Sequence, residues 1–278
     1  MPAIQLARLK IQSANLAKSF ANPGTFVGGL HELLDFYADR TRRPGQAGKP
    51  PPLHFAYNVP TPVLRWVLKE LTPLVKDNPQ AGFTLCDALW AESYFEFRLL
   101  AASLLGEIRP SAPNDCLKRV DKWTTPQTED RLINVVVKEG LEYLRQNYPD
   151  QYMNQVEIWL NSKEIHNKKL GLRAMSALIA AQDFENLPAL YRILAPQIRE
   201  VPGKLKPDML DTIKALAQRF PNEVAFFLKQ NLEIKTDNPG TSWLIRNSLR
   251  YFPNNIQTSL RTALHQNQES VSNQDLGG

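Results

Sequence analysis

Residues 82–106, GFTLCDALWAESYFEFRLLAASLLG, decide the fold that the sequence predicts. Apolar residues recur in this stretch at steps of three and four positions: Leu85, Leu89, Phe95, Leu99, Ala102 and Leu105. Each half therefore carries one apolar stripe, and a neighbouring helix is needed to cover it. We expect two short helices that face each other across a tight joint, so the stretch predicts a stack of helical hairpins.

The same periodicity runs through the rest of the chain and is interrupted at turn signals such as Asn22-Pro23-Gly24 and Pro221. It gives about fourteen helices, or seven antiparallel pairs, at the irregular spacing of divergent HEAT-like repeats. No strand pattern competes. The predicted fold is an all-α solenoid with a concave basic face. We expect one domain over residues 1–268, and a disordered polar tail over residues 269–278.

Composition sets bounds on the kind of protein. The chain has 33 Lys and Arg residues and 28 Asp and Glu residues, which gives a net charge of +5. This mild positive charge permits a polyanionic partner without requiring one. No secretory signal is recognised at the start, and no apolar run approaches the roughly 20 residues that span a bilayer. Cys86 and Cys116 are expected to be reduced core thiols. We therefore expect a cytoplasmic, monomeric protein with no membrane contact.

Three segments carry a resemblance to a known family. Residues 57–65, YNVPTPVLR, resemble the "(F/Y)-G-V-x-x-P-x-(L/M)-R" motif of the AlkD-like DNA alkylation repair family of HEAT-repeat proteins. Leu89-Trp90 followed by Glu96-x-Arg98 is similar to that family's "LW…S…E-x-R…A…LL" segment. Residues 241–249, TSWLIRNSL, resemble its closing "W-I-R-K-A" helix. The similarity covers roughly residues 55–252.

Asn58 stands where the family motif has glycine. Asparagine tolerates a positive φ better than most residues, so we expect the turn to be kept. The resemblance implies a protein that binds double-stranded DNA at alkylated or distorted sites. It also implies a metal-free DNA glycosylase that acts on purines alkylated at N3 or N7, in which the cationic leaving group needs little acid assistance.

The junction after Trp123 bears most directly on catalysis. In catalytic members of the family, a tryptophan here is followed four residues later by an aspartate that stabilises the charge developing on the deoxyribose. Trp123 matches, but Gln127 occupies the acid position, and a neutral amide cannot supply the field of a carboxylate. Glu129 or Asp130 could replace it if the helix that we expect to begin at Thr125-Pro126 were shifted by half a turn.

Two alternatives stay open at this junction. Glu129 and Asp130 are either substitute catalytic carboxylates or acids that favour a helix N-terminus. Trp123 is either a packing residue or a contact to the ligand.

Basic residues supply the candidate DNA contacts. His166-Asn167-Lys168-Lys169 stands where the family has a tryptophan and a "W-x-x-R-x-A" start, so His166 either stacks on a sugar or base or is an exposed helix-start residue. Lys163, Lys168, Lys169 and Arg173 form either a phosphate track or a solvated helix face.

Further candidate contacts lie at the two ends of the resemblance: Arg65, Trp243, Arg246 and Arg250. Arg246 and Arg250 are four positions apart, a spacing at which two guanidinium groups on one helix face can follow neighbouring phosphates. Arg40, Arg42 and Arg43 end the second predicted helix, where they either complement its dipole or bind phosphate.

Other kinds of chemistry find no support in the sequence. No phosphate-binding glycine-rich loop, no Ser or Cys nucleophile in a recognisable setting and no paired His ligands are present, so we expect no metal and no cofactor. Two functions remain. The first is an AlkD-like DNA-binding protein. Whether it also excises the damaged base stays open, because Gln127 and His166 replace side chains that are expected of an active glycosylase. The second is a HEAT-repeat scaffold whose concave face holds another protein, because a shared fold does not by itself imply a shared function.

Overall fold

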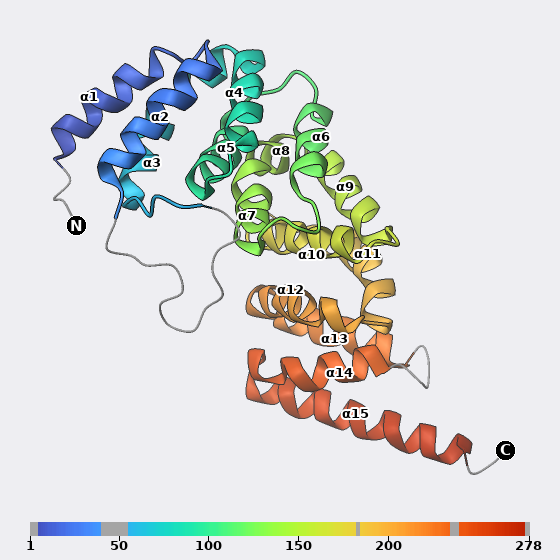
Figure 1. The fold of residues 1–278 in the computed structure, drawn as a ribbon. Helices are drawn as coiled ribbons and strands as arrows, with labels where there is room; N and C mark the ends of the chain where they lie inside the picture. Colours follow the sequence, from blue (N-terminus) through green and yellow to red (C-terminus); the bar gives the residue numbers. More distant parts are fainter. Residues whose placement is uncertain (1–4, 40–54, 182–183, 234–238, 276–278) are drawn as a thin grey trace. The chain divides into compact units, whose positions relative to one another are not determined.

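The structure is a computed structural model that describes residues 5–39, 55–181, 184–233 and 239–275 of the 278-residue chain (Figure 1). The predicted basic cluster of Arg40, Arg42 and Arg43 lies outside these residues. Within them all regular structure is helical, from α1 to α15, apart from one isolated β-bridge between Phe55 and Tyr94. The all-α prediction is confirmed for the described part of the chain.

The chain divides into two compact units, Met1–Tyr152 and Met153–Gly278. The boundary falls inside α9, Pro149–Asn161. The prediction of one domain over residues 1–268 stays a prediction. The first unit contains the following helices: α1 (Leu6–Ala17), α2 (Pro23–Tyr37), α3 (Thr61–Asp77), α4 (Pro79–Ala91), α5 (Phe95–Glu107), α6 (Asn114–Trp123), α7 (Asp130–Val135), a π-helical turn (Val136–Gly140) and α8 (Glu142–Asn147).

Alternate helices of the first unit pack on one another. One row consists of α1, α3, α5 and α7, each in contact with the next, while α2 packs on α4 beside it (Figure 1). The core between these helices contains large apolar side chains with no exposed surface, among them Phe26, Leu34, Leu71, Leu89, Phe97 and Leu105. This is the packing order expected when consecutive hairpins stack.

The stripe predicted for α5 is only partly right. Ala102 and Leu105 are fully buried, but Phe95 and Leu99 are half-buried and line a cavity instead. The buried face of α5 is completed by Phe97 and Leu100. A helix between two neighbours is apolar on more than one side, so a single stripe does not identify the side that faces the core.

Asparagine and proline together begin several of these helices. The side chain of Asn22 accepts a hydrogen bond from the backbone N–H of Thr25, at 3.2 Å, and Asn78 accepts one from Ala81, at 3.1 Å. A proline follows each of these asparagines directly, in a position whose missing N–H has no helical partner to lose. These sequence signals set where α2 and α4 begin.

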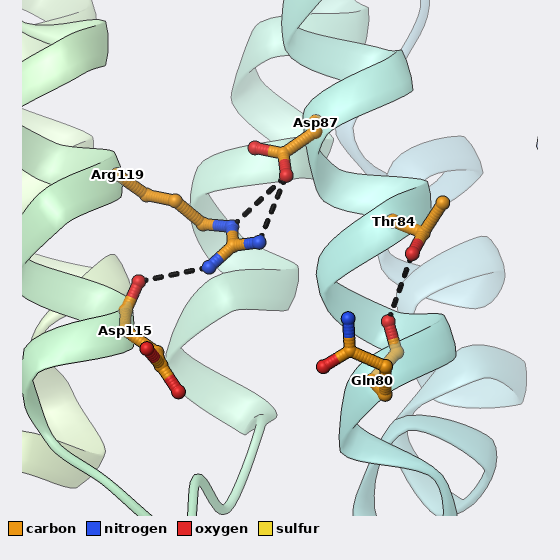
Figure 2. Close-up of polar contacts among 5 residues, drawn as sticks. All are labelled: Gln80, Thr84, Asp87, Asp115 and Arg119. Carbon is orange, nitrogen blue, oxygen red and sulfur yellow. Dashed lines mark hydrogen bonds and ion pairs between the residues drawn. The ribbon is translucent and has the colours of Figure 1, made fainter.

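Arg119 ties α6 to α4. Its Nε and Nη2 donate to Asp87 Oδ2 at 3.1 and 2.9 Å, and its Nη1 donates to the Asp115 carbonyl oxygen at 2.9 Å (Figure 2). The guanidinium also lies 4.1 Å from the centre of the Phe83 ring, which is a cation–π contact. On α4, the Thr84 hydroxyl donates to the Gln80 carbonyl oxygen, as Figure 2 also shows. Because α6 ends at Trp123, this contact helps to fix the start of the following junction.

The segment after Trp123 differs from the predicted continuous helix. Helix α7 begins at Asp130 rather than at Thr125-Pro126, and the helix then changes to π geometry at Val136 and resumes as α8 at Glu142. A Cβ atom on Gly106 of α5 would clash with the Glu139 carbonyl oxygen, so glycine is required for this close approach. Gly140 in turn lies against the carbonyl oxygen of Ala102. Backbone packing of this kind leaves no trace in the hydrophobic periodicity.

The second unit repeats the alternate packing. Its remaining helices are α10 (Ile165–Ile179), α11 (Leu187–Arg199), α12 (Lys206–Arg219), α13 (Pro221–Glu233), α14 (Pro239–Ser248) and α15 (Asn254–Asp275), with 3₁₀ turns at Gly203–Leu205 and Leu249–Tyr251. One row runs through α10, α12 and α14, and a second runs through α11, α13 and α15. Helix α15 continues to Asp275, and thus into the residues 269–278 for which the sequence predicts a disordered tail.

Candidate functional site

A cavity of about 540 Å³ opens in the first unit between the segment that precedes α3 and helices α3, α5 and α7. Its apolar wall includes Leu64, Leu68 and Leu99. Its polar lining consists of Arg65, Glu96, Ser103, Glu129, Arg131 and Glu139. Three carboxylates and two guanidinium groups thus share one concave site, which is the kind of feature that a candidate active site requires.

Glu96 builds the wall of this cavity. Its side chain is 4% exposed, and its two carboxylate oxygens accept hydrogen bonds from the backbone N–H groups of Tyr57, at 3.1 Å, and Asn58, at 2.7 Å. Asn58 has a φ of 54°, so the prediction that it keeps the family's turn is confirmed. The Glu96 carboxylate is committed to holding the turn, which places Asn58 and Val59 on the cavity wall.

Glu139 reaches the cavity from the π-helical turn. The Ser103 hydroxyl on α5 donates a hydrogen bond of 2.5 Å to its Oε2. The π turn shifts the side chains of its residues relative to a regular helix, and such turns occur frequently at functional sites. Sequence analysis did not single out Glu139 or Ser103, because their proximity depends on the close approach at Gly106.

The junction between α6 and α7 contributes a third carboxylate. The Thr128 hydroxyl donates to the Trp123 carbonyl oxygen at 2.9 Å, and the Thr128 N–H donates to the Thr125 carbonyl oxygen at 2.9 Å. These bonds close a turn where the sequence predicted the first turn of a helix. Gln127 and Asp130 are exposed, whereas Glu129 is half-buried and lines the cavity.

Trp123 lies in the core beneath this junction. It is 2% exposed, and its ring stacks on Trp90 with 4.6 Å between the ring centres and 6° between the planes. The arrangement corresponds to the packing alternative for Trp123, and its predicted contact to DNA stays a prediction. Trp90 also carries a cation–π contact, since the Arg98 guanidinium lies 5.6 Å from its ring centre.

Arg98 connects this tryptophan pair to Glu129. Its Nε donates to the Glu92 carbonyl oxygen at 2.9 Å. Burial lowers the pKa of Arg98, and the negative charge of Glu129 opposes that shift. The two groups are therefore close enough to interact electrostatically. The sequence comparison had marked Arg98 only as part of the Glu96-x-Arg98 motif.

Two arginines give the cavity positive charge. Arg65 on α3 is exposed and lines the cavity, and its contact to DNA stays a prediction. Arg131, which the sequence analysis did not name, places its guanidinium 4.6 Å from the centre of the Phe95 ring. A planar cation held on an aromatic face is pre-organised to pair with a phosphate.

The other predicted basic contacts belong to the second unit. Lys168 donates to Gln197 Oε1 at 3.0 Å, and Arg173 pairs with Asp208 at 2.7 Å with 13% and 9% of the two side chains exposed. Arg173 thus joins α10 to α12 through a buried ion pair. His166 and Lys169 are half-buried residues of the first turns of α10. That these residues contact DNA stays a prediction.

The predicted arginine pair near the end of the chain does not lie on a single α-helix. Arg246 is exposed on α14, but α14 ends at Ser248 and Arg250 belongs to the following 3₁₀ turn, where it donates to the Tyr251 hydroxyl at 2.8 Å. A 3₁₀ turn has fewer residues per turn than an α-helix, so the four-residue spacing no longer stacks the two side chains. Trp243 is half-buried, with the Lys206 ammonium 4.5 Å from its ring centre.

The described residues lack two features that mark other classes of protein. No group of three His, Cys, Asp or Glu side chains among them is arranged to hold a metal ion. None of their helices combines the length and the apolar character needed to cross a bilayer. Both cysteines are free and buried, as predicted.

Residues 54–246 match the model of a family described as DNA alkylation repair enzyme. Searches of curated proteins and of solved structures returned no significant match. The matched region covers well over half of the chain and includes the turn at Asn58, the whole cavity lining and the α6–α7 junction. The chain therefore belongs to the DNA alkylation repair enzyme family.

Proposed function

We propose that this protein binds duplex DNA and releases purines alkylated at N3 or N7, with the Glu129 carboxylate in the role that the sequence first sought at position 127. The observation that carries the proposal is the placement of the three junction candidates. Glu129 lines the cavity, whereas Gln127 and Asp130 are exposed and do not line it. Family membership supplies DNA as the substrate class.

The proposed reaction is hydrolysis of the N-glycosidic bond. Alkylation at N3 or N7 makes the purine cationic, so the bond breaks with its electron pair leaving on the base. Positive charge then develops on the deoxyribose, and a fixed carboxylate stabilises that charge most effectively in a partly dry site. Water adds to the sugar carbon and loses a proton to solvent. No metal ion or cofactor takes part in the proposed reaction.

The cavity residues have distinct proposed roles. Glu129 faces the developing sugar cation, while Arg65 and Arg131 pair with phosphates that flank the damaged nucleotide. Glu96 and the Ser103–Glu139 pair support the walls. Binding by the second unit is proposed to use His166, Lys168, Lys169, Arg173, Trp243, Arg246 and Arg250, as the sequence predicts.

We also propose that the alternate helix packing of both units continues as one HEAT-like solenoid of about seven helix pairs with a concave basic face. The two rows of helices in each unit support this proposal. Small-angle scattering from the whole chain would test it, since a curved solenoid has a larger radius of gyration than a compact globule of equal length.

The test of the reaction is single-turnover release of 7-methylguanine and 3-methyladenine from alkylated duplex DNA. Glu129→Gln keeps the size of the side chain and removes its charge, and we expect it to lower the rate by roughly 100-fold. Asp130→Asn is the matched control, because it removes a neighbouring exposed charge, and its rate should stay within about twofold of wild type. Equal loss in both variants would contradict the assignment of Glu129.

Duplex binding is measured in the same experiment at two salt concentrations. Neutralised phosphates release counterions, so affinity should fall steeply as salt is added. Binding of duplex DNA without release of the methylated purines would indicate a DNA-binding protein that is not catalytic. The absence of both would favour a protein-binding scaffold, the second function that the sequence left open.

A further inference from the structure

Two lysines and a tryptophan gather where α1 packs on α3. The Trp66 ring of α3 is half-buried, and two ammonium groups lie against it: Lys10 Nζ of α1 at 4.8 Å from the ring centre and Lys69 Nζ of α3 at 4.6 Å. Both lysines are exposed. Their ammonium groups are thus at most about 10 Å apart, which is on the scale of the Debye length at physiological salt. We call Lys10, Trp66 and Lys69 the lysine–tryptophan cluster.

No acidic side chain offsets the charge of this cluster. Neither ammonium group forms an ion pair with a carboxylate among the residues that the structure describes. The sequence of α1 and its surroundings adds to the excess, since residues 5–31 contain Arg8, Lys10 and Lys18 but no Asp or Glu. Like charges held this close repel one another, and a bound polyanion would relieve that repulsion.

The cluster adjoins the cavity through Arg65. Arg65 and Lys69 are four positions apart within α3, so their side chains lie on the same face of the helix. Arg65 lines the cavity between α3 and α5, whereas Trp66 meets Lys10 of α1. Helix α1 packs against α3 and thereby extends the row of helices whose members α3, α5 and α7 form the cavity. Three cations therefore lead from the cavity across α3 to α1.

We propose that Lys10 and Lys69 bind backbone phosphates of the duplex that continues from the cavity over α3 and α1. This inference rests on the proposed function, because it takes duplex DNA as the ligand of the cavity. It also extends that function beyond the region that defines the family, since α1 lies outside the matched residues 54–246.

The chemistry of the cluster suits phosphate rather than bases. A lysine ammonium binds phosphate as a point charge, and phosphate contacts fix the position of the duplex without reading its sequence. The Trp66 ring attracts both ammonium groups, so the two flexible side chains lose less freedom when a phosphate binds. The cluster should therefore add affinity equally for damaged and undamaged DNA.

The experiment measures how the affinity for duplex DNA depends on salt, with one duplex unmodified and one of the same sequence alkylated. We expect Lys10→Ala and Lys69→Ala each to reduce the slope of log affinity against log salt by about one, and the double variant by about two. Each single variant should weaken binding about fivefold at physiological salt. The ratio of the two dissociation constants should not change, because the lost contacts are to phosphates.

Two further variants serve as controls. Lys10→Arg keeps the positive charge and should retain the slope. Lys18→Ala removes the other lysine of this region, whose ammonium donates to Asn15 Oδ1 at 2.9 Å at the end of α1, and should also leave the slope unchanged. Circular dichroism checks that the alanine variants are folded, as expected for exposed side chains.

An anionic lipid surface is the other polyanion that α1 is able to meet, since its Leu6 and Ile11 are 53% and 64% exposed beside the basic residues. Cosedimentation with vesicles that contain phosphatidylserine tests this alternative. Vesicle binding that is lost in Lys10→Ala, together with an unchanged salt slope for DNA, would assign the cluster to a membrane and overturn the inference.

The remaining outcomes separate the inference from the proposed function. A steep salt slope that is the same in wild type, Lys10→Ala and Lys69→Ala overturns the role of the cluster and leaves DNA binding by the cavity standing. A wild-type protein that binds neither duplex overturns the proposed function and this inference with it. A reduced slope in both alanine variants, absent from Lys10→Arg and Lys18→Ala, supports both.

Discussion

Gly106 occupies a position where a side chain has no room. Its missing Cβ lets the Glu139 carbonyl oxygen approach the α5 backbone, and this contact accompanies the π turn that brings Glu139 to Ser103. We expect Gly106→Ala to lower the free energy of unfolding by about 3 kcal/mol, because backbone atoms would have to move. Gly28→Ala is the control. No atom lies within 4 Å of its added Cβ, so on the exposed face of α2 it should stabilise by about 0.5–1 kcal/mol. Urea unfolding monitored by circular dichroism measures both, and equal effects would refute the packing argument.

The two cysteines give a pH prediction at the same scale. Burial raises the pKa of Cys116 to about 12 and also raises the pKa of Cys86. Native protein should therefore react slowly with iodoacetamide between pH 7 and pH 9, whereas urea-unfolded protein should react increasingly fast over that range. The thiols remain protonated in the fold, so their contribution to stability is complete below an unfolded pKa near 9 and is lost as pH rises toward 12. Rapid labelling of both thiols in native protein at pH 8 would contradict their placement in the core.

Helix α6 is held by a contact that only arginine can make. Lysine at position 119 could reach either Asp87 or the Asp115 carbonyl, but it lacks the planar fork that bonds both (Figure 2). We expect Arg119→Lys to cost about 1–2 kcal/mol of stability. A double-mutant cycle with Asp87→Asn should show a coupling of at least about 0.5 kcal/mol. Arg261→Lys, which alters an exposed contact to Gln257 within α15, should change stability by less than about 0.5 kcal/mol. Additive effects of Arg119→Lys and Asp87→Asn would show that the contact between the two side chains contributes no free energy to stability.

At the level of elements, sequence reasoning succeeded where periodicity and capping residues act locally. The turn signal Asn22-Pro23-Gly24 falls where α1 has ended and α2 begins, and Asn58 adopts the positive φ expected of it. The candidate site was harder to predict from the sequence. Thr125-Pro126 has the form of a helix start, but Thr128 satisfies the local backbone groups and delays α7 to Asp130. Glu129 lines the cavity as a result, and the catalytic role that the sequence left as one of two alternatives for it stays a prediction. Ser103 and Glu139 meet only through tertiary packing, so no local pattern could have paired them.

At the scale of the whole molecule, the buried Arg173–Asp208 pair tests how cooperatively the two units unfold. Asp208→Asn removes a carboxylate that is 9% exposed from beside a buried guanidinium, and we expect it to cost about 3–5 kcal/mol. The unit boundary falls within α9, so the units share a continuous helix, and we expect them to unfold in one transition. Urea unfolding followed by pulsed amide hydrogen exchange and mass spectrometry would give a midpoint for each unit from its own peptides, in the unmodified chain. A shift of the midpoint for the second unit alone would instead indicate two independent domains.

The stacked indoles of Trp90 and Trp123 have an optical consequence. Chromophores that lie 4.6 Å apart share their excited states, so this pair should show exciton coupling, which gives a couplet in the circular dichroism spectrum when the transition dipoles of the two stacked rings are skewed. Isolated tryptophans give no such couplet. Since Trp123 ends α6 and Arg98 connects Trp90 to Glu129, the couplet would serve as a label-free signal of any rearrangement at the junction, read from the unmodified chain.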